Sequence, residues 1–260
     1  MTKAQLAVDQ DIVYKMTKPD PPLADFVDSF WLFFNHSPSD KQFVVLPDGR
    51  IDLLFYRSKT EPLRIVLLGL ETQYAPRIVA ANTELFAVSF KLLATDYIFP
   101  NTVANLLNQA KSLPPGFWQV SPDDLYDFDV FCQLITEKIQ SFLPKVIERR
   151  KQRLFDLVYS SNGSLTVKKL SEKVGWSSRQ INRYFNQQYG LSLKAYCSIL
   201  RFKAALKPIS EGNLFPEHAF TDQNHFIKTI KRYAGVTPKI LRKNKDDRFY
   251  YLTALRNQPT

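Results

Sequence analysis

Cysteine and histidine are scarce in this chain of 260 residues, which holds two cysteines and three histidines. Cys132 and Cys197 lie in different segments, which favours reduced, buried thiols over a disulfide and suits a cytoplasmic protein. The histidines, His36, His218 and His225, show none of the Cys/His spacings that are typical of zinc sites. The sequence therefore predicts no structural or catalytic metal, and no cofactor.

Long apolar stretches are also missing. No apolar run reaches the roughly 18 residues that a helix needs to cross a bilayer, so we expect no membrane partner. Residues 1–15 contain no secretory hydrophobic segment, which again favours the cytoplasm. Hydrophobic residues nevertheless make up 45% of the chain. That fraction is enough to fill real cores, and a chain of this length commonly forms two domains.

Acidic residues are few in the second part of the chain. Residues 145–248 hold 22 Lys and Arg against 8 Asp and Glu, a net charge of +14, whereas residues 1–144 hold 12 and 17, a net charge of −5. Phosphate contacts supply the sequence-independent part of DNA affinity, so a polyanionic partner accounts for this asymmetry better than a solvated surface does. The distribution predicts that residues 145–248 bind double-stranded DNA.

Residues 164–190 have the pattern of a helix, a sharp turn and a second helix. Apolar residues recur at helical spacing as far as Val174. Gly175 can adopt the left-handed conformation that ends a helix, and Ser177 or Ser178 can then cap the next one. This arrangement predicts a helix-turn-helix unit.

The second helix of this unit has two contrasting faces. Ile181 and Phe185 are four residues apart, so both are expected to point inward. The opposite face presents guanidinium and amide groups, which can hydrogen-bond to base edges in the DNA major groove. The residues expected to contact DNA here are Arg179, Gln180, Asn182, Arg183 and Asn186.

A second, similar unit follows at 214–243. Its motif elements read, in order, Ala219-Phe220-Thr221-Asp222, Phe226, Ile230-Lys231 and Gly235-Val236-Thr237-Pro238. Over residues 145–245 the chain resembles AraC/XylS-type bacterial transcription regulators, whose DNA-binding domain carries two helix-turn-helix units and a comparable Gly-Phe-x-Asp to Gly-x-Thr-Pro pattern. Two such units in tandem are far more specific than one.

The resemblance implies two recognition helices that enter the major groove about one helical turn apart. Lys168 in the first unit, with Arg201 and Lys203 on the helix that joins the units, is expected to contact phosphates, which position a protein without reading sequence. The joining helix, at about 193–207, is expected to end before Pro208. The second-unit residues implied to face DNA are Asn224, His225 and Lys228.

The second unit departs from the family pattern. Phe215, followed by Pro216, stands where a small residue is usual, and Ala219 replaces the usual turn glycine. Because proline inside a helix removes a hydrogen bond and clashes with the preceding turn, we expect the helix at about 213–218 to be short or distorted. The first unit is therefore expected to be the main reader of DNA sequence.

Residues 1–112 are a different kind of chain, in which short apolar runs alternate with turn signals. Pro47-Asp48-Gly49 lies between the runs 44–46 and 51–56 and is typical of a tight β-turn, because proline presets φ and glycine supplies a positive φ. Helical spacing is found at Leu23, Phe26, Val27 and Phe30. Further strands are expected at 64–70, 76–80 and 84–92.

This strand pattern predicts a compact barrel or sandwich. The pair Phe30-Trp31 and the segment LPDGRIDLLF resemble the N-terminal sensor domain of some AraC-type regulators, a degenerate cupin-like barrel. The resemblance implies a pocket for a small apolar or aromatic effector, and the residues expected to line it are Trp31, Phe33, Tyr56 and Phe90. Two alternatives stay open: the rings simply fill the core, or the domain binds another protein instead of a ligand.

Between the two parts, Pro114-Pro115-Gly116 breaks the chain, and Ser121 is expected to cap a helix over about 123–142. Apolar residues of this helix alternate in spacings of three and four, as in a coiled-coil seam. The seam either holds an antiparallel homodimer, as in many relatives, or packs on the N-terminal domain of its own chain. The seam residues are Leu125, Phe128, Cys132, Ile135, Ile139 and Phe142.

Together these features predict an α+β protein, with an N-terminal β-rich, barrel-like domain followed by an all-α tandem helix-turn-helix domain. The expected segments are a β-rich, candidate ligand-sensing domain at 1–112, a linker with a candidate dimerisation helix at 113–144, the DNA-binding domain at 145–245 and a tail at 246–260. The expected function is sequence-specific regulation of transcription without catalysis. Candidate partners are DNA, a second copy of the chain, a small-molecule effector and RNA polymerase.

An alternative function is a nucleic-acid-modifying enzyme that uses AraC-like helices to reach its target. Such an enzyme needs a reactive cysteine or paired catalytic carboxylates in the first part of the chain. The first cysteine is Cys132, and the acidic residues of 1–112 form no recognisable catalytic arrangement. With His36 as its only histidine, that segment also lacks the ligand set of a metal-dependent cupin enzyme.

Overall fold

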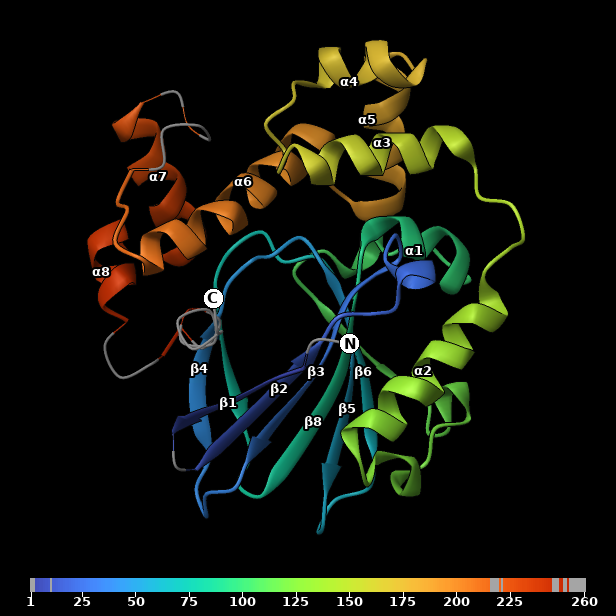
Figure 1. Cartoon of the computed structure of the whole chain (residues 1–260), viewed down its shortest axis with the longest axis vertical. Helices are drawn as coiled ribbons and strands as arrows, with labels where there is room; N and C mark the ends of the chain where they lie inside the picture. Colours follow the sequence, from blue (N-terminus) through green and yellow to red (C-terminus); the bar gives the residue numbers. More distant parts are fainter. Residues whose placement is uncertain are drawn as a thin grey trace.

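The structure is a computed structural model, and it describes residues 3–9, 11–215, 220, 222–244, 248, 249 and 252. Strands build its first part and helices its second (Figure 1), so the predicted α+β class is confirmed. The strands are β1 (Lys3–Asp9), β2 (Ile12–Thr17), β3 (Val27–Asn35), β4 (Lys41–Val45), β5 (Ile51–Ser58), β6 (Arg64–Leu68), β7 (Ala75–Val79), β8 (Thr83–Phe90) and β9 (Ala110–Leu113).

One helix follows the main strands, one leads out of the N-terminal domain and the others build the DNA-binding part. The α-helices are α1 (Leu92–Ile98), α2 (Phe128–Phe142), α3 (Arg149–Ser160), α4 (Val167–Val174), α5 (Ser178–Tyr189), α6 (Leu193–Ser210), α7 (Gln223–Ala234) and α8 (Pro238–Lys243). Short 3-10 turns are η1 (Pro21–Leu23), η2 (Ala104–Leu106), η3 (Phe117–Gln119) and η4 (Pro122–Leu125).

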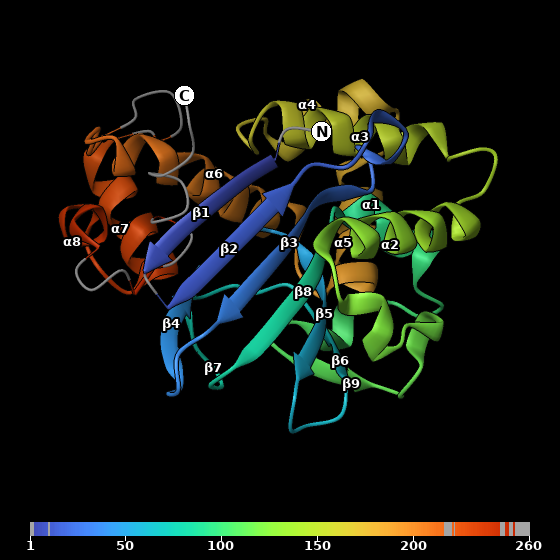
Figure 2. The ribbon, with the colours of Figure 1, turned by 60° about the horizontal axis from the view of Figure 1, so that its bottom comes forward.

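The strands form an open antiparallel sheet and a separate strand pair. The main sheet has the order β1-β2-β3-β8-β5-β6-β9, and β4 pairs with β7 (Figure 2). Val79 of β7 packs in one apolar cluster with Phe33 and Leu85 of the main sheet, so the strand pair covers part of that face. The expected barrel is therefore corrected: among the described residues, the sheet does not close on itself.

The helical spacing that begins at Leu23 does not produce a helix. The 3-10 turn η1 leads almost directly into β3, a central strand of the sheet. β3 is buried on both faces, with Phe30 against Phe131 of α2 and Phe33 in the cluster on the opposite face. A strand buried on both faces carries apolar residues at consecutive positions, and such a run contains helical spacings by coincidence.

Pro47-Asp48-Gly49 bends the chain as predicted but does not close a hairpin. β4 pairs with β7, and β5 pairs with β6 and β8, so this turn carries the chain from the strand pair into the main sheet. Gly49 has φ +75°, and its carbonyl accepts a hydrogen bond from the Tyr196 hydroxyl (2.9 Å). A Cβ at Gly49 would lie 3.0 Å from the Leu200 side chain. The bend therefore fits the surface of α6.

The helix expected over 123–142 is divided in two. Asp124 accepts hydrogen bonds from the N–H and the hydroxyl of Ser121 at the start of η4. A second cap follows at Asp127, whose carboxylate accepts from the first N–H groups of α2. Each acidic side chain accepts hydrogen bonds at the start of a separate helical segment. Two segments, η4 and α2, therefore begin where one helix was predicted.

Most of the apolar seam of α2 is buried within its own chain, although Phe142 at its end is 41% exposed. Phe131, Ile135 and Ile139 are fully buried. The Phe131 ring packs against Phe30 and Phe86 of the main sheet, at 6.5 and 5.3 Å between ring centroids, and Figure 1 shows α2 lying along that sheet. Of the two accounts of the seam, this packing favours the helix that covers its own domain.

The first helix-turn-helix unit forms as predicted. α4 ends at Gly175, which has φ +68°, and Ser177 caps α5 by accepting from the N–H of Gln180 (3.2 Å). The side-chain oxygen of Gln180 accepts from the N–H of Ser177 (2.8 Å), which completes a capping box. Ile181 and Phe185 are fully buried. Local chemistry therefore sets both ends of the turn.

The second unit is described in part. Asp222 caps α7 by accepting from the N–H of His225 (2.8 Å), and Phe226 and Ile230 are fully buried as predicted. Of the distorted helix expected at about 213–218, residues 213–215 are not helical, and residues 216–218 lie outside the described residues.

The joining helix α6 runs past Pro208 to Ser210, so its predicted end is too early. Pro208 lies in the last turn, so it removes a single backbone hydrogen bond, the one to the carbonyl of Ala204.

The described residues after α8 pack onto the N-terminal domain. The Arg248 carbonyl accepts from the Val44 N–H of β4 (2.7 Å), and Phe249 and Leu252 are buried. The expected tail at 246–260 is therefore at least partly docked. Within the described ranges, no helix has both the length and the apolar character to cross a membrane.

Candidate DNA interface and interdomain cavity

The outer face of α5 carries the side chains predicted to read DNA. Arg179, Arg183 and Asn186 are exposed, and none of them forms an ion pair within the described part of the chain. Gln180 is exposed too, but its side-chain oxygen is engaged in the capping box. Asn182 is half-buried, and its Oδ1 has no hydrogen-bond partner among the described residues. The two arginines are therefore the most available donors on this helix.

The outer face of α7 has a smaller set of donors. Asn224, His225 and Lys228 are exposed, as predicted for residues that could face DNA. Ile227 is partly buried and packs against the core instead of pointing outward. The His225 ring lies 5.7 Å from the Phe220 ring. No guanidinium group stands beside Lys228 in the first two turns of α7.

The three candidates for phosphate contact lie in different environments. Lys168 is exposed on α4. Arg201 donates through Nη1 to the Gly163 carbonyl (2.6 Å), a contact that ties α6 to the end of α3. Lys203 lies 3.4 Å from a carboxylate oxygen of Asp48 in the N-terminal domain. In this arrangement only Lys168 presents a free ammonium group to solvent, and Lys203 faces the interior of the molecule.

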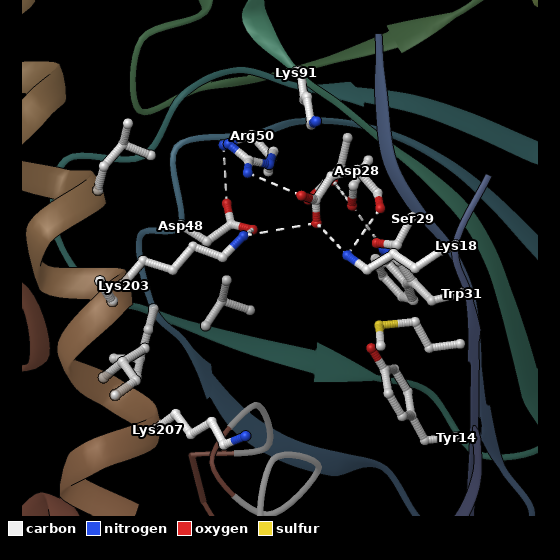
Figure 3. Close-up of a pocket in the computed structure, with 18 of the residues that line it drawn as sticks. Tyr14, Lys18, Asp28, Ser29, Trp31, Asp48, Arg50, Lys91, Lys203 and Lys207 are labelled. Atoms are coloured by element: carbon white, nitrogen blue, oxygen red, sulfur yellow. Dashed lines mark hydrogen bonds and ion pairs between the residues drawn. The ribbon is translucent and has the colours of Figure 1, made fainter. Parts of the chain in front are cut away.

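A cavity of about 530 Å³ lies between the main sheet and α6. Tyr14 and Trp31 of β2 and β3 form one wall, and Lys203 and Lys207 reach in from α6 on the other (Figure 3). Its volume lies in the range of small-molecule sites, which run from about 300 to 1,000 Å³. The cavity combines apolar walls with charged side chains that come from both domains.

An ion network closes one end of this cavity. Asp28 accepts from Arg50 Nη2 (2.9 Å) and lies 3.3 Å from Lys18 Nζ and 3.7 Å from Lys203 Nζ (Figure 3). Burial alone would raise the pKa of Asp28, but the charges of Arg50, Lys203 and Lys18 hold that pKa well below its usual range. The network therefore favours the ionised form of Asp28, and it joins the N-terminal domain to α6.

A second carboxyl group in the cavity behaves differently. Asp52 is half-buried, and its removal from water raises the pKa of Asp52 to about 7, with the nearby charge of Asp48 acting in the same direction. The Ser89 hydroxyl donates to Asp52, and Trp31 Nε1 donates to Ser89 (3.0 Å). Positive groups outnumber carboxyl groups along the cavity wall, where Asp28, Asp48 and Asp52 are the acidic residues. The positive groups are Lys18, Arg50, Lys91, Lys203 and Lys207.

Two of the four aromatic residues predicted to contact a ligand line the cavity. Trp31 and Phe33 do so. Tyr56 instead lines a separate hollow near the β5–β6 turn. Phe90 is fully buried, and its ring packs edge-on against Phe99 at 5.5 Å, so it belongs to the core. Of the two alternatives for these rings, contact with a ligand or filling of the core, Trp31 and Phe33 fit the first and Phe90 fits the second.

The N-terminal domain also contacts the recognition helix α5. The Tyr184 hydroxyl donates to Asp96 Oδ2 of α1 (2.8 Å), and Lys151 of α3 donates to the same oxygen (2.7 Å). The Tyr189 hydroxyl lies 2.7 Å from that of Tyr184 and donates to the Leu92 carbonyl (3.3 Å). Asp96 is only 4% exposed. A buried carboxylate of one domain therefore meets two helices of the other.

Two further tyrosines complete this interface. The Tyr196 hydroxyl donates to the Gly49 carbonyl, and the Tyr159 hydroxyl accepts from the Leu92 N–H (2.9 Å). The two hydroxyls lie 3.0 Å apart. The Arg50 guanidinium sits 5.0 Å from the centre of the Tyr159 ring, which also lines the cavity. Tyr159 and Arg50 therefore belong both to the wall of the cavity and to the interface between the domains.

Sequence reasoning did not find the charged groups of the cavity. Asp28, Arg50 and Lys203 come from three separate segments, so no local spacing connects them. One signal was present: Asp52 is a charged residue inside the apolar run 51–56. A carboxylate in the middle of a strand that is otherwise apolar suggests a buried polar site.

Comparison with solved structures finds matches to ToxT from Vibrio cholerae. One ToxT structure is 12% identical, with a TM-score of 0.46, and the match covers 86% of this chain and 98% of ToxT. A ToxT structure with a bound unsaturated fatty acid is 11% identical, with a TM-score of 0.38 and coverage of 80% and 96%. No curated protein sequence matches the chain.

Family models match both parts of the chain. A model described as a helix-turn-helix domain matches residues 170–244, and one described as a domain of unknown function, DUF6597, matches residues 15–112. The helix-turn-helix match contains α5 and α7, whose outer faces are exposed. These features define a DNA-binding transcription regulator. With the tandem units closed by Gly235-Val236-Thr237-Pro238, the helix-turn-helix match supports an AraC-type regulator.

Proposed function

We propose that this regulator reads its operator mainly through α5, with Arg179 and Arg183 as the base-reading residues. The observation that carries the proposal is the contrast between the two faces of α5. Ile181 and Phe185 anchor one face in the core, and the arginines of the other are exposed. Arginine is the side chain best suited to guanine in the major groove, because its paired N–H donors match the O6 and N7 acceptors.

The test uses duplexes that the full chain selects from a random pool, with a scrambled duplex of equal length for comparison. Arg183→Ala is expected to weaken binding to the selected duplex by about 1–3 kcal/mol and to relax the preference at one base pair. Arg179→Ala combined with Arg183→Ala should abolish the preference. An Arg183→Ala protein with unchanged affinity and unchanged preference would show that α5 does not read bases.

Lys168→Ala is the matched control. It should weaken binding to selected and scrambled duplexes alike, because a phosphate contact carries no base information. It should also flatten the log–log dependence of affinity on salt by about 0.9.

The second unit has a positioning role in this proposal. The support is its poorer set of outward donors, since Lys228 stands on α7 without a guanidinium neighbour. Asn224→Ala and Lys228→Ala should mainly lower the overall affinity, and Lys228→Ala should flatten the salt dependence. If either variant changes which bases are preferred, the second unit reads sequence as well.

The cavity between the sheet and α6 is the proposed effector site. Its apolar wall around Trp31 and Phe33 suits a hydrophobic body, and the excess of cations in its lining, Lys207 among them, suits an anionic head group. An amphiphilic carboxylate has both properties. Such a ligand would contact both domains at once, because Lys207 belongs to α6 and Trp31 to β3.

Decanoate and its uncharged analogue decanol are suitable probes. Decanoate should raise the melting temperature of the full chain and bind at least several-fold more tightly than decanol. Lys207→Met should remove the difference between the two probes. Lys194→Met, an exposed position on α6 that does not line the cavity, is the control. Equal binding of both probes by the wild type, or no binding of either, would exclude an anionic amphiphile at this site.

The remaining features of the proposed function come from the regulator family. A regulator of this type acts by occupying DNA in the cytoplasm and catalyses no reaction, in contrast to the enzyme alternative. Contact with RNA polymerase is an expectation of the same kind. A homodimer needs a surface other than the seam of α2, since Ile135 and Ile139 are buried. Sedimentation of the wild-type chain, with and without operator DNA, tests the oligomeric state.

A further inference from the structure

Residues of the N-terminal domain hold α5 at two levels. Near its middle, Asp96 of α1 accepts a hydrogen bond from the Tyr184 hydroxyl (2.8 Å). At its C-terminal end, the Thr102 hydroxyl and the Val103 N–H both donate to the Gln188 carbonyl, each at 3.1 Å. A helix held at two separated levels has little freedom to rotate or to slide.

Of the two contacts, the one at Asp96 constrains the orientation of α5 more strongly. The carboxylate is 4% exposed and is shared between Tyr184 and Lys151, whose ammonium group lies 5.1 Å from the centre of the Tyr184 ring. The Tyr189 hydroxyl joins the same cluster through Tyr184. Hydrogen bonds to an ionised, buried acceptor are short and directional, so they fix the direction in which Tyr184 leaves the helix.

Arg179 and Arg183 lie on another face of α5, about 140° and 100° around the helix axis from Tyr184. Tyr184 follows Arg183 in the chain, so any rotation of the helix that moves Tyr184 also moves the guanidinium group next to it. Reading a base edge requires donors held within about 0.5 Å of their productive position. The orientation of Tyr184 is therefore coupled to the geometry of base reading.

We propose that Asp96 is a positioning residue for DNA recognition: through Tyr184 it fixes the rotation of α5, so that Arg179 and Arg183 face the groove together. Asp96 touches no DNA in this role. The inference rests on the proposed role of α5 as the base reader. It assigns to the N-terminal domain a direct part in sequence specificity, in addition to any part in binding an effector.

The test measures a ratio, the affinity of the full chain for its selected duplex divided by its affinity for a scrambled duplex. Asp96→Asn and Tyr184→Phe should each lower this ratio about tenfold, the size expected when one charge-assisted hydrogen bond is lost. The affinity for the scrambled duplex and its salt dependence should not change, because no phosphate contact is removed. The double variant should lose no more than the larger single effect, because both changes remove the same contact.

Glu84→Gln is the matched control, because it breaks a partly buried ion pair with Arg57 in the sheet, away from α5. It should lower stability and leave the ratio intact. If the ratio falls equally in Glu84→Gln, or if selected and scrambled duplexes weaken together, Asp96 has a purely structural role and the inference is wrong. Tyr184→Phe keeps the ring and so gives an answer even where Asp96→Asn folds poorly.

Arg183→Ala in the same assay separates this inference from the proposed function. If Arg183→Ala leaves the ratio unchanged, α5 does not read bases, and both the proposed function of α5 and the positioning role of Asp96 are refuted. A ratio that falls in Arg183→Ala but not in Asp96→Asn or Tyr184→Phe would refute the positioning role alone.

Discussion

Replacing Asp28 with asparagine should destabilise the folded chain more than a typical single substitution. Asp28 is the carboxylate on which Arg50, Lys18 and Lys203 converge. The Arg50 side chain is 7% exposed, and its Nε already lacks a hydrogen-bond partner among the described residues. Without Asp28, the guanidinium would stay buried without its ion-pair partner, and Asp48 would be the remaining carboxylate that acts on it.

The expected loss in the free energy of unfolding is about 3–5 kcal/mol, the usual cost of leaving one member of a buried ion pair unpaired. Arg50→Met added to Asp28→Asn should recover part of this loss, since no unpaired buried charge then remains. The effect also depends on pH. Because the pKa of Asp28 is lowered in the folded state, its contribution is present above the unfolded pKa of about 4 and is lost as pH falls below that value.

Urea denaturation at pH 7.5 and at pH 3.5 measures both effects. The wild type should lose stability between these conditions more steeply than Asp28→Asn does. A loss below about 1 kcal/mol at pH 7.5, with an unchanged m-value, would refute the reasoning that the network compensates a buried charge.

Two other changes have clear expected outcomes. Burial raises the pKa of Asp52 to about 7, so the stability of the wild type should fall as pH rises from about 4 to 7. Denaturation curves of Asp52→Asn should show a weaker dependence of stability on pH over this range. An equally steep dependence in the variant would contradict this. Ile135→Glu combined with Ile139→Glu should unfold the N-terminal domain, because both side chains are fully buried. If the wild type is a dimer and the double variant is a folded monomer by circular dichroism and sedimentation, the seam of α2 holds the dimer after all.

Features that depend on neighbouring residues could be predicted from the sequence. Gly175 and Ser177 mark the turn before α5 because a left-handed glycine and a capping serine act within a few residues. The exposed face with Arg179 and Arg183 followed from helical periodicity once Ile181 was placed in the core. The amphipathic pattern thus predicted that Arg179 and Arg183 are exposed, and their contact with DNA stays a prediction.

Features that depend on distant pairing could not be predicted in the same way. The bend at Gly49 was expected, but its strands pair with β7 and β8 across long stretches of chain. Phe30 looked helical because a strand buried on both faces has no alternation. The cavity was missed because Asp28 and Lys203 are brought together only by the docking of α6 on the sheet.

Four tyrosine hydroxyls at the domain interface have a consequence for protein engineering. Tyr159, Tyr184, Tyr189 and Tyr196 all belong to the DNA-binding part, and their partners on the other side are a backbone turn, the start of α1 and Asp96. A hybrid regulator made by joining a foreign sensor to residue 149 would leave these hydroxyls facing an unmatched surface. The smallest part that can be exchanged between regulators is therefore the helical half together with the turn at Gly49 and helix α1, to which it is hydrogen-bonded. Grafts that carry these segments along should stay soluble where simple fusions aggregate.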